Sequence, residues 1–562
     1  MKLSDIDYNR FDAGAALREL TELTVRFQNA PDCAGQLEAY RRFMEIYKHF
    51  ESCASLAYIR FTLDTQDAFY SAENDYYDEI SPVVQDKYVA FAAAMLSSRF
   101  RPELEKQLSP LIFTNYEIVR KAFAPFIIED VQEENRLTTA YKKLLSSAQI
   151  PFQGEVLNIP QLGKYRDSTD RSVRKAAYGA QGVWMKSHAA EFDGLFDRLV
   201  AVRNRMAVKM GYKNYVQLGY YRMGRNCYSP EDIAAFRSQV LADWVPFVAA
   251  CKKKQAAELG VDRIMLYDDN IMLKNGNPQP AGNVLESGRK MYSELSEQTR
   301  EFIDFMFGHE LFDVQARKGK SGGGYCTEIP DYKMPFVFSN FNGTYDDVDT
   351  LTHEFGHALA SYTAMKNIPL YELWQGGMDT CEIHSMSMEF FAWKYIGLFF
   401  GGQAEDYKKM HVANAVSFLP YGTMVDTFQQ LVYEKPQMTP LERKQLWLEL
   451  ESKFRPYLSS EGIPYLEEGG RWQYQSHIYE RPFYYIDYCL AQTVALYFLK
   501  DSLQDYSGAF SRYFSLLAKG GSQTFSNLVQ EAGIPLPYAP GTLKQLAEEL
   551  SKHVPYLSIR FS

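Results

Sequence analysis

The stretch Thr352-His353-Glu354-Phe355-Gly356-His357 has the residue types and the spacing of a metal-binding helix. On an α-helix, positions i and i+4 share a face, so His353 and His357 can present two imidazole nitrogens to one ion about 2 Å away. Glu354 is rotated by about 100° from His353 around the helix axis. This rotation keeps Glu354 out of the histidine pair but close to a water molecule held by the ion.

Residues around this stretch favour a helix. Three aspartates between residues 346 and 349 lie where negative charge stabilises a helix N-terminus. Apolar residues recur at helical spacing at Val348, Leu351, Phe355 and Leu359. Glycine inside a helix costs about 1 kcal/mol relative to alanine, so Gly356 suggests the close approach of another backbone.

A catalytic zinc site needs a third protein ligand, because zinc typically takes three and leaves a fourth position for water. Glu382 is the preferred candidate, since it opens a second helical pattern, residues 381–400, that follows soon enough to pack antiparallel to the first. His384 is the alternative, although positions i and i+2 do not face the same way on a helix. Asp379-x-x-Glu382 also fits a capping box, which would need no metal.

Glu389 lies seven residues after Glu382 and therefore on the same helical face. We expect this carboxylate to orient one of the histidine ligands from behind.

A second polar cluster follows near residue 477. His477 precedes a helix that Pro482 is expected to begin, and Tyr485, Tyr488 and Gln492 follow on one face of it. Fixed hydroxyl or imidazole donors lower the barrier for attack of water on a carbonyl, because they stabilise the oxyanion that forms. A tyrosine-rich stripe of this kind is also typical of core packing.

Residues 335–341 alternate and are β-rich, which predicts a strand just before the metal-binding helix. An exposed edge there could bind an extended peptide as an added strand, and an ordinary hairpin strand is the alternative. The run Lys318-Gly-Lys-Ser-Gly-Gly-Gly-Tyr325 resembles a phosphate-binding loop, but Val314 stands where its first glycine belongs and no helix pattern follows. We interpret this run as a glycine hinge.

Together these motifs resemble a known signature. His353–His357, followed by Glu382-Ile-His-Ser-Met-Ser-Met-Glu389, is similar to the zinc-peptidase signature of the oligoendopeptidase F and thimet oligopeptidase family, in its bacterial oligoendopeptidase branch. The resemblance extends through residues 336–343 and 477–488. It covers most of the chain from about Arg166 onward, and the part before it more loosely.

The resemblance implies a mainly α-helical, two-lobed peptidase with a deep central channel and a small β-sheet near the active site. It implies one zinc ion per chain, with Glu382 as the third ligand beside His353 and His357. It also implies hydrolysis of internal bonds in short unfolded peptides, with Glu354 as the general base on a zinc-bound water.

The family places a histidine and tyrosine hydroxyls from the second cluster over the substrate. His477 matches this histidine, but its spacing to the tyrosines departs from the thimet oligopeptidase pattern. Tyr488 is therefore the first choice for stabilising the oxyanion and Tyr485 the second, with Tyr479 and Tyr484 as the remaining alternatives.

Two other functions fit parts of the sequence. A metallocarboxypeptidase of similar helical build would need a group that binds the terminal carboxylate of its substrate. A metal-dependent peptide-binding protein without turnover is the other, and the presence of Glu354 argues against it.

The chain has 562 residues, more than one ordinary domain. We expect residues 1–165, which carry helical patterns at 15–29, 33–70 and 76–97 but no catalytic constellation, to form a channel wall. Residues 166–562 form the catalytic region in this interpretation. Ser229-Pro-Glu-Asp predicts a helix start, and the polar stretch 266–283 is expected to be an exposed excursion.

Composition and charge limit the kinds of binding partner and the cellular compartment that we expect. The net charge is −10 without a basic stripe, so nucleic acid is an unexpected partner. The sequence shows neither a secretory signal nor an apolar run near 18 residues, which predicts a cytoplasmic protein without a membrane span. Seven scattered cysteines without C-x-x-C spacing predict neither disulfides nor a cysteine zinc site, and we expect them to be reduced and buried.

Overall fold

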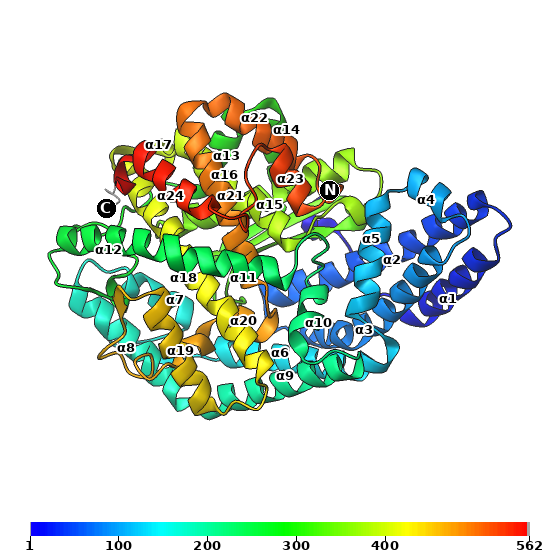
Figure 1. Ribbon diagram of the computed structural model, residues 1–562, viewed down its shortest axis with the longest axis horizontal. Coiled ribbons are helices and arrows are strands. Elements are labelled where there is room, and N and C mark those ends of the chain that lie inside the picture. Colours follow the sequence, from blue (N-terminus) through cyan, green and yellow to red (C-terminus); the bar gives the residue numbers. More distant parts are fainter. Residues whose placement is uncertain (1, 559–562) are drawn as a thin grey trace.

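Helices form most of the chain in the computed structural model, which describes residues 2–558 (Figure 1). The strands are short and form two two-stranded sheets and one three-stranded sheet within these residues. The predicted mainly α-helical class is therefore confirmed. No helix in the described part of the chain has the length and apolar character needed to cross a bilayer.

The first five helices extend to one side of the molecule and share a hydrophobic core of their own (Figure 1). They are α1 Ala13–Asn29, α2 Cys33–Leu63, α3 Ala68–Leu96, α4 Arg101–Gln107 and α5 Pro110–Ala122. The predicted helix at 33–70 is divided in the structure, because the Asp67 side chain accepts hydrogen bonds from the Phe69 and Tyr70 amides and starts α3. The assignment of residues 1–165 to a channel wall stays a prediction.

A second group of helices leads from this part of the chain towards the catalytic motifs. It comprises α6 Ile128–Ser146, the hairpin β1 Ile150–Phe152 and β2 Glu155–Leu157, α7 Ile159–Arg166, α8 Arg171–Ser187, α9 Ala189–Lys209 and α10 Tyr215–Arg222. Helix α11, Pro230–Gln239, starts as predicted after a Ser229 capping box. It continues through a π-helical turn, Val240–Trp244, into α12, Val245–Leu259.

The expectation of an exposed excursion at residues 266–283 is wrong for much of the stretch, because buried residues recur in it as far as residue 278. Leu266–Asp268 form a buried 3₁₀ turn, and Ile271 and Met272 are also buried. Asp268 is fully buried because Arg171 and Arg174 bind its carboxylate at 2.7 and 2.8 Å. Polar residues in this stretch therefore need not face solvent, because a buried carboxylate such as that of Asp268 is paired with arginines.

The three-stranded sheet precedes the metal-binding helix, as predicted. Its strands are β4 Phe312–Gln315, β5 Tyr325–Ile329 and β6 Met334–Phe341, in the order β4-β6-β5. Because β6 pairs with β4 on one side and β5 on the other, the expected free edge at residues 335–341 does not exist. The outer strands of this sheet are β4 and β5.

The glycine-rich run before β5 is held by its lysine. Lys320 Nζ donates to the Asp313 side chain and to three backbone carbonyls, those of Asp313, Gln315 and Ser339. The ammonium group is thereby satisfied within the protein, and a strand follows instead of a helix, so a phosphate loop is excluded. The hinge interpretation stays a prediction.

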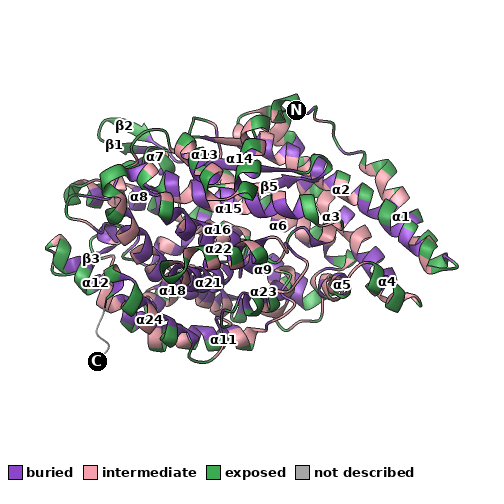
Figure 2. Cartoon of the chain, turned by 90° about the horizontal axis from the view of Figure 1, so that it is seen from above, coloured by how far each residue is buried: buried purple, intermediate pink, exposed green. Residues whose placement is uncertain are grey.

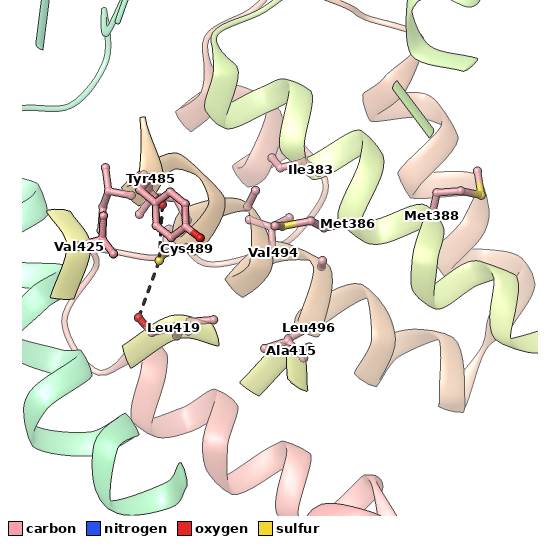
Figure 3. Close-up of a cluster of buried hydrophobic side chains, with 14 of the residues drawn as sticks. Ile383, Met386, Met388, Ala415, Leu419, Val425, Tyr485, Cys489, Val494 and Leu496 are labelled. Carbon is pink, nitrogen blue, oxygen red and sulfur yellow. Dashed lines mark hydrogen bonds between the residues drawn. The ribbon is translucent and has the colours of Figure 1, made fainter. Parts of the chain in front are cut away.

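The centre of the molecule is built from α15 Asp346–Asn367, α16 Met378–Phe391, α18 Ala404–Glu434 and α21 Tyr485–Gln504. Helix α16 packs between α15 and α21, and α18 packs against α21. Figure 2 shows buried residues concentrated on these central helices. In Figure 3, Met386 of α16 lies beside Val494 of α21, and the Cys489 thiol donates to the Leu419 carbonyl of α18.

The remaining elements surround this centre. They are β3 Ile264–Met265 paired with β7 Leu458–Ser459, α13 Val284–Leu295, α14 Glu297–His309, α17 Gly397–Phe400, α19 Pro440–Phe454, α20 Ser476–Glu480, α22 Tyr506–Leu517, α23 Phe525–Glu531 and α24 Thr542–His553. All seven cysteines are free, but only Cys53 and Cys489 are buried, so the expectation of buried thiols holds for those two alone.

Candidate functional site

Two packed helices bring three candidate metal ligands together. His353 and His357 on α15 place their Nε2 atoms 3.2 and 3.4 Å from Glu382 Oε2 on α16. The ligand atoms of the three residues lie within 4.8 Å of one another. Two imidazole nitrogens and one carboxylate oxygen at this spacing fit a single zinc ion with a further position open.

Gly356 explains how α16 comes close enough to bring Glu382, the third candidate ligand, to the two histidines. A Cβ atom at Gly356 would lie 2.9 Å from both the His384 carbonyl oxygen and the Ser385 Cα on α16. The close backbone approach expected at this glycine is therefore confirmed. The contact that this approach allows between α15 and α16 offsets the cost of a glycine inside a helix.

The competing interpretations of Glu382 and its neighbours do not match the geometry. Helix α16 begins at Met378 after Gly377, so Asp379 and Glu382 both lie inside it and form no capping box. His384 is buried outside the three-residue cluster, and its Nε2 has no hydrogen-bond partner. Burial lowers the pKa of His384 to about 3, which keeps it neutral.

Charges around the cluster favour a cation. Burial alone would raise the pKa of Glu382, but the neighbouring His357 and His353 lower it well below its ordinary value. Burial would likewise lower the pKa of His353, and hydrogen bonds from it to Glu382 and Glu389 raise it instead. The carboxylates thus favour positive charge on the histidines, and a divalent cation could take the place of the histidine protons.

Glu354 lies beside the ligands without belonging to them. Its side chain is buried, and a Cβ atom built on Gly324, just before β5, would lie 3.1 Å from its Oε1. Burial raises the pKa of Glu354, while the nearby His353 and His357 oppose the increase. A buried carboxylate with a raised pKa is a stronger proton acceptor than one in water.

Glu389 contacts the ligand that it was expected to orient. Its Oε1 lies 2.7 Å from His353 Nδ1, and its Oε2 lies 2.8 Å from His411 Nε2. His411 belongs to α18 and carries no motif in the sequence. Only the packing of α18 against the other helices reveals it.

The rings of His477, Tyr484 and Tyr488 lie against one another, and the Tyr484 hydroxyl reaches Glu382. His477 lies in the short helix α20, and α21 begins at Tyr485, so the helix start expected at Pro482 is wrong. Phe483 between them has a φ of 69°, which ends the turn after Pro482. Tyr484 follows this turn directly, and its hydroxyl is directed at Glu382.

Tyr488, the preferred candidate for stabilising the oxyanion, lies beside His477. Its hydroxyl lies 3.4 Å from His477 Nε2, and Gln475 Nε2 lies 3.1 Å from His477 Nδ1. Burial lowers the pKa of His477 to about 4, so the ring is neutral at neutral pH. With Gln475 donating to Nδ1, His477 carries its proton on Nε2, towards Tyr488.

The other tyrosines have different positions. Tyr484 donates its hydroxyl proton to Glu382 Oε1, while Ser385 donates to Oε2 at 2.9 Å, so both oxygens of this ligand are held. Tyr485 packs against Phe418 and Tyr421, and its ring also contacts His477 with centroids 5.1 Å apart. Sequence reasoning ranked Tyr485 above Tyr484, because spacing alone does not reveal which ring the turn directs at Glu382.

Tyr479 faces away from the site. Its ring stacks on Tyr141 with centroids 3.9 Å apart, and its hydroxyl donates to the Phe192 carbonyl. This tyrosine belongs to the core and not to the candidate site.

Two buried arginines hold the segment that carries His477 and Tyr484. Arg203 donates to the Tyr479 carbonyl and pairs with Glu134. Arg225 donates to the Phe483 carbonyl and pairs with Asp487 at 2.7 Å. The sequence contains no local pattern that reveals these contacts, because the partners are far apart in the chain.

Comparisons with known proteins find similar sequences along most of the chain. The model of the peptidase M3 N-terminal domain matches residues 3–123, and that of peptidase family M3 matches residues 164–548. Oligopeptidase PepF of Bacillus subtilis is 20% identical over 513 residues, which cover 85% of this chain and 74% of PepF.

Solved structures are similar over the whole chain. The structure of PZ peptidase A with an inhibitor has 42% identity and a TM-score of 0.97, and the match covers 99% of both chains. A structure from Bacillus anthracis assigned as an oligoendopeptidase F has 39% identity and a TM-score of 0.91, covering 100% of this chain and 98% of its own. With a family model matching well over half of its length, this chain belongs to peptidase family M3, whose members are metallopeptidases.

Proposed function

We propose that the protein is a zinc-dependent endopeptidase that hydrolyses internal bonds of short unfolded oligopeptides. The observation that carries this proposal is the cluster of His353, His357 and Glu382, whose ligand atoms lie within 4.8 Å of one another beside the buried Glu354. Membership of the family supports peptide hydrolysis, and the cluster supports one metal ion per chain.

His353, His357 and Glu382 hold the zinc ion in this proposal. When bound, the ion supplies Lewis-acid polarisation of a water molecule and of the scissile carbonyl. Tyr484 and Ser385 keep the Glu382 carboxylate in place through their hydrogen bonds. Glu389 keeps the His353 ring in place in the same way.

Glu354 is the general base. Its raised pKa, caused first by burial, suits a carboxylate that takes a proton from the attacking water and then passes it to the leaving amine. The neutral His477, with Tyr488 beside it, donates a hydrogen bond to the oxyanion formed during the attack.

The substrate is an extended, flexible peptide. Strand β5 is an outer strand of its sheet and begins next to Glu354, so a peptide paired along it would pass the base. Backbone pairing of this kind gives affinity without requiring a particular sequence. Residues 1–165 act as the wall that restricts access.

A peptide blocked at both ends, with products identified by mass spectrometry, tests the proposal. We expect internal cleavage that stops when a chelator removes the metal and resumes when zinc is added. Cleavage only of the peptide with a free carboxyl end would favour a carboxypeptidase instead. Zinc-dependent binding of the peptide without any product would favour the non-catalytic alternative.

A further inference from the structure

A chain of hydrogen bonds runs from His353 into the core behind it. His353 Nδ1 lies 2.7 Å from Glu389 Oε1, and Glu389 Oε2 lies 2.8 Å from His411 Nε2. At the far end, Trp393 Nε1 donates to His411 Nδ1 at 2.9 Å. The four side chains come from α15, from α16 with the 3₁₀ turn that follows it, and from α18.

Trp393 determines which nitrogen of His411 carries the proton, because an indole N–H can only donate, and the ionised Glu389 carboxylate can only accept. His411 therefore accepts at Nδ1 and carries its own proton on Nε2, which it donates to Glu389. The other oxygen of Glu389 then accepts the Nδ1 proton of His353. Once a metal ion takes the place of the proton that His353 shares with Glu382, the lone pair that becomes free is the one on Nε2.

The His411 ring is enclosed so that it keeps this orientation. Its residue is 4% exposed, and the Tyr407 ring lies nearly parallel to it, with centroids 5.5 Å apart and planes 14° apart. Phe390 packs against it with centroids 4.8 Å apart. The nearby titratable groups are Tyr407 and Asp349, and the Tyr407 hydroxyl donates to Asp349.

We propose that His411, anchored by Trp393, is a positioning residue for the metal centre. It holds the Glu389 carboxylate in one orientation and thereby determines which nitrogen of His353 is free for the ion. This inference rests on the proposed function, since it concerns the metal that His353 would bind. It adds the third helix, α18, to the groups that determine the metal affinity.

His411→Phe and His411→Gln separate this role from simple packing. Phenylalanine fills the space between Tyr407 and Phe390 but makes no hydrogen bond to Glu389. Glutamine can accept from Trp393 through its carbonyl and donate to Glu389 through its amide. We expect His411→Phe to weaken zinc binding by about 10- to 100-fold and His411→Gln to restore it to within about threefold of wild type.

Trp393→Phe removes the donor at the far end of the chain. Trp244→Phe is its matched control, since Trp244 is also buried and also donates its indole proton to α18, to the Val416 carbonyl at 2.8 Å, but outside the chain of hydrogen bonds to His353. We expect Trp393→Phe to weaken zinc binding and Trp244→Phe to leave it unchanged.

Zinc dissociation constants measured by competition with a fluorescent chelator decide between the outcomes. The visible spectrum of the cobalt-substituted protein supplies a second readout, and we expect it to change in His411→Phe but not in His411→Gln. Zinc affinity in His411→Phe within about threefold of wild type would overturn the proposal. If that variant does not fold, as judged by circular dichroism, equal affinities in Trp393→Phe and Trp244→Phe overturn it.

The same measurements distinguish this inference from the proposed function. If the wild-type protein bound no stoichiometric zinc, both the proposed zinc-dependent function and the role of His411 would be contradicted. Tight zinc binding by the wild type and by every variant alike would remove only the role of His411.

Discussion

At the residue scale, each acidic group near the ligands has one task set by its contacts. Glu382 presents an oxygen to both histidines, Glu389 contacts His353 from behind, and Glu354 remains beside the cluster. Single substitutions should therefore separate metal binding from chemistry.

Glu354→Gln should keep the zinc and lose the activity. Glutamine has the same shape but cannot take a proton, and general-base catalysis contributes roughly 10² to 10⁴ in rate. We expect kcat to fall by that range with little change in KM, measured on a peptide substrate together with the zinc content. A zinc-loaded variant within about tenfold of wild type would exclude Glu354 as the base, since tenfold is only about 1.4 kcal/mol of barrier.

Tyr484→Phe and Tyr488→Phe should have different effects. Removing the Tyr484 hydroxyl leaves Glu382 Oε1 without its donor, and a hydrogen bond to a charged group contributes about 1.5 to 3 kcal/mol. We expect zinc affinity to fall by at least about tenfold in Tyr484→Phe. Tyr488→Phe is the control, because Tyr488 contacts His477 and not a ligand, so kcat should fall while zinc affinity is retained.

The opposite pattern of zinc affinity and kcat would exchange the roles proposed for Tyr484 and Tyr488. Unchanged zinc affinity in Tyr484→Phe together with a large loss of kcat would place Tyr484, and not Tyr488, over the substrate.

At the element scale, the distance between α15 and α16 controls the site. These helices touch at Gly356, so a single methyl group there tests their packing.

Gly356→Ala should destabilise the protein although it raises helix propensity. The added Cβ would lie 2.9 Å from two backbone atoms of α16, and overpacking of this kind costs about 1 to 3 kcal/mol. We expect lower stability in urea unfolding and weaker zinc binding, because Glu382 moves away from the histidines. Gly308→Ala in α14 is the control, since a Cβ at Gly308 meets nothing within 4 Å and should leave both quantities unchanged or slightly improved.

The buried pairing of α6 with α9 and α10 should respond to acid. Burial alone would raise the pKa of Glu134, but Arg222 and Arg203 lower it to about 2 from its ordinary value of 4.5. Because the folded-state pKa is the lower one, Glu134 stabilises the fold above pH 4.5, and this contribution is lost as the pH falls towards 2. Between pH 5.5 and 3.5 the loss should be about 1.4 kcal/mol.

Urea unfolding at pH 5.5 and 3.5 measures this difference. Glu134→Gln should reduce the pH dependence by that amount, whereas Glu133→Gln, on the neighbouring and more exposed position, should not. An identical pH dependence in wild type and Glu134→Gln would mean that Glu134 titrates normally in the folded protein.

At the scale of the whole molecule, the proposed preference for short peptides depends on how enclosed the site is. The side chains of His353 and His357 are 20% and 16% exposed, and Glu354 is buried, so little of the candidate site is open to solvent.

Native globular proteins should therefore resist cleavage. The same protein, once reduced, alkylated and digested to peptides, should be cut, because its segments are then short and flexible. Gel electrophoresis and mass spectrometry of the two forms compare them directly. Cleavage of the native form as fast as of the peptides would contradict an enclosed site.

The sequence by itself determined the parts of the site that lie on one helix. The spacing of His353 and His357 places both on one face of α15 whatever surrounds them, because the helical repeat is local. Gly356 pointed to a close neighbour for the same reason, since its cost in a helix needs a compensating contact. The mainly α-helical class followed from the same periodicity along most of the chain.

Only the tertiary structure decided which distant groups meet. His411 on α18, the Tyr484 contact with Glu382 and the burial of Asp268 all depend on elements that pack across large separations in the chain. The position of β6 in the middle of its sheet depends on pairing with both β4 and β5, and no periodicity within one strand reports how many neighbours it has. Local propensities set the elements, whereas the shape of the packed core selects the contacts between them.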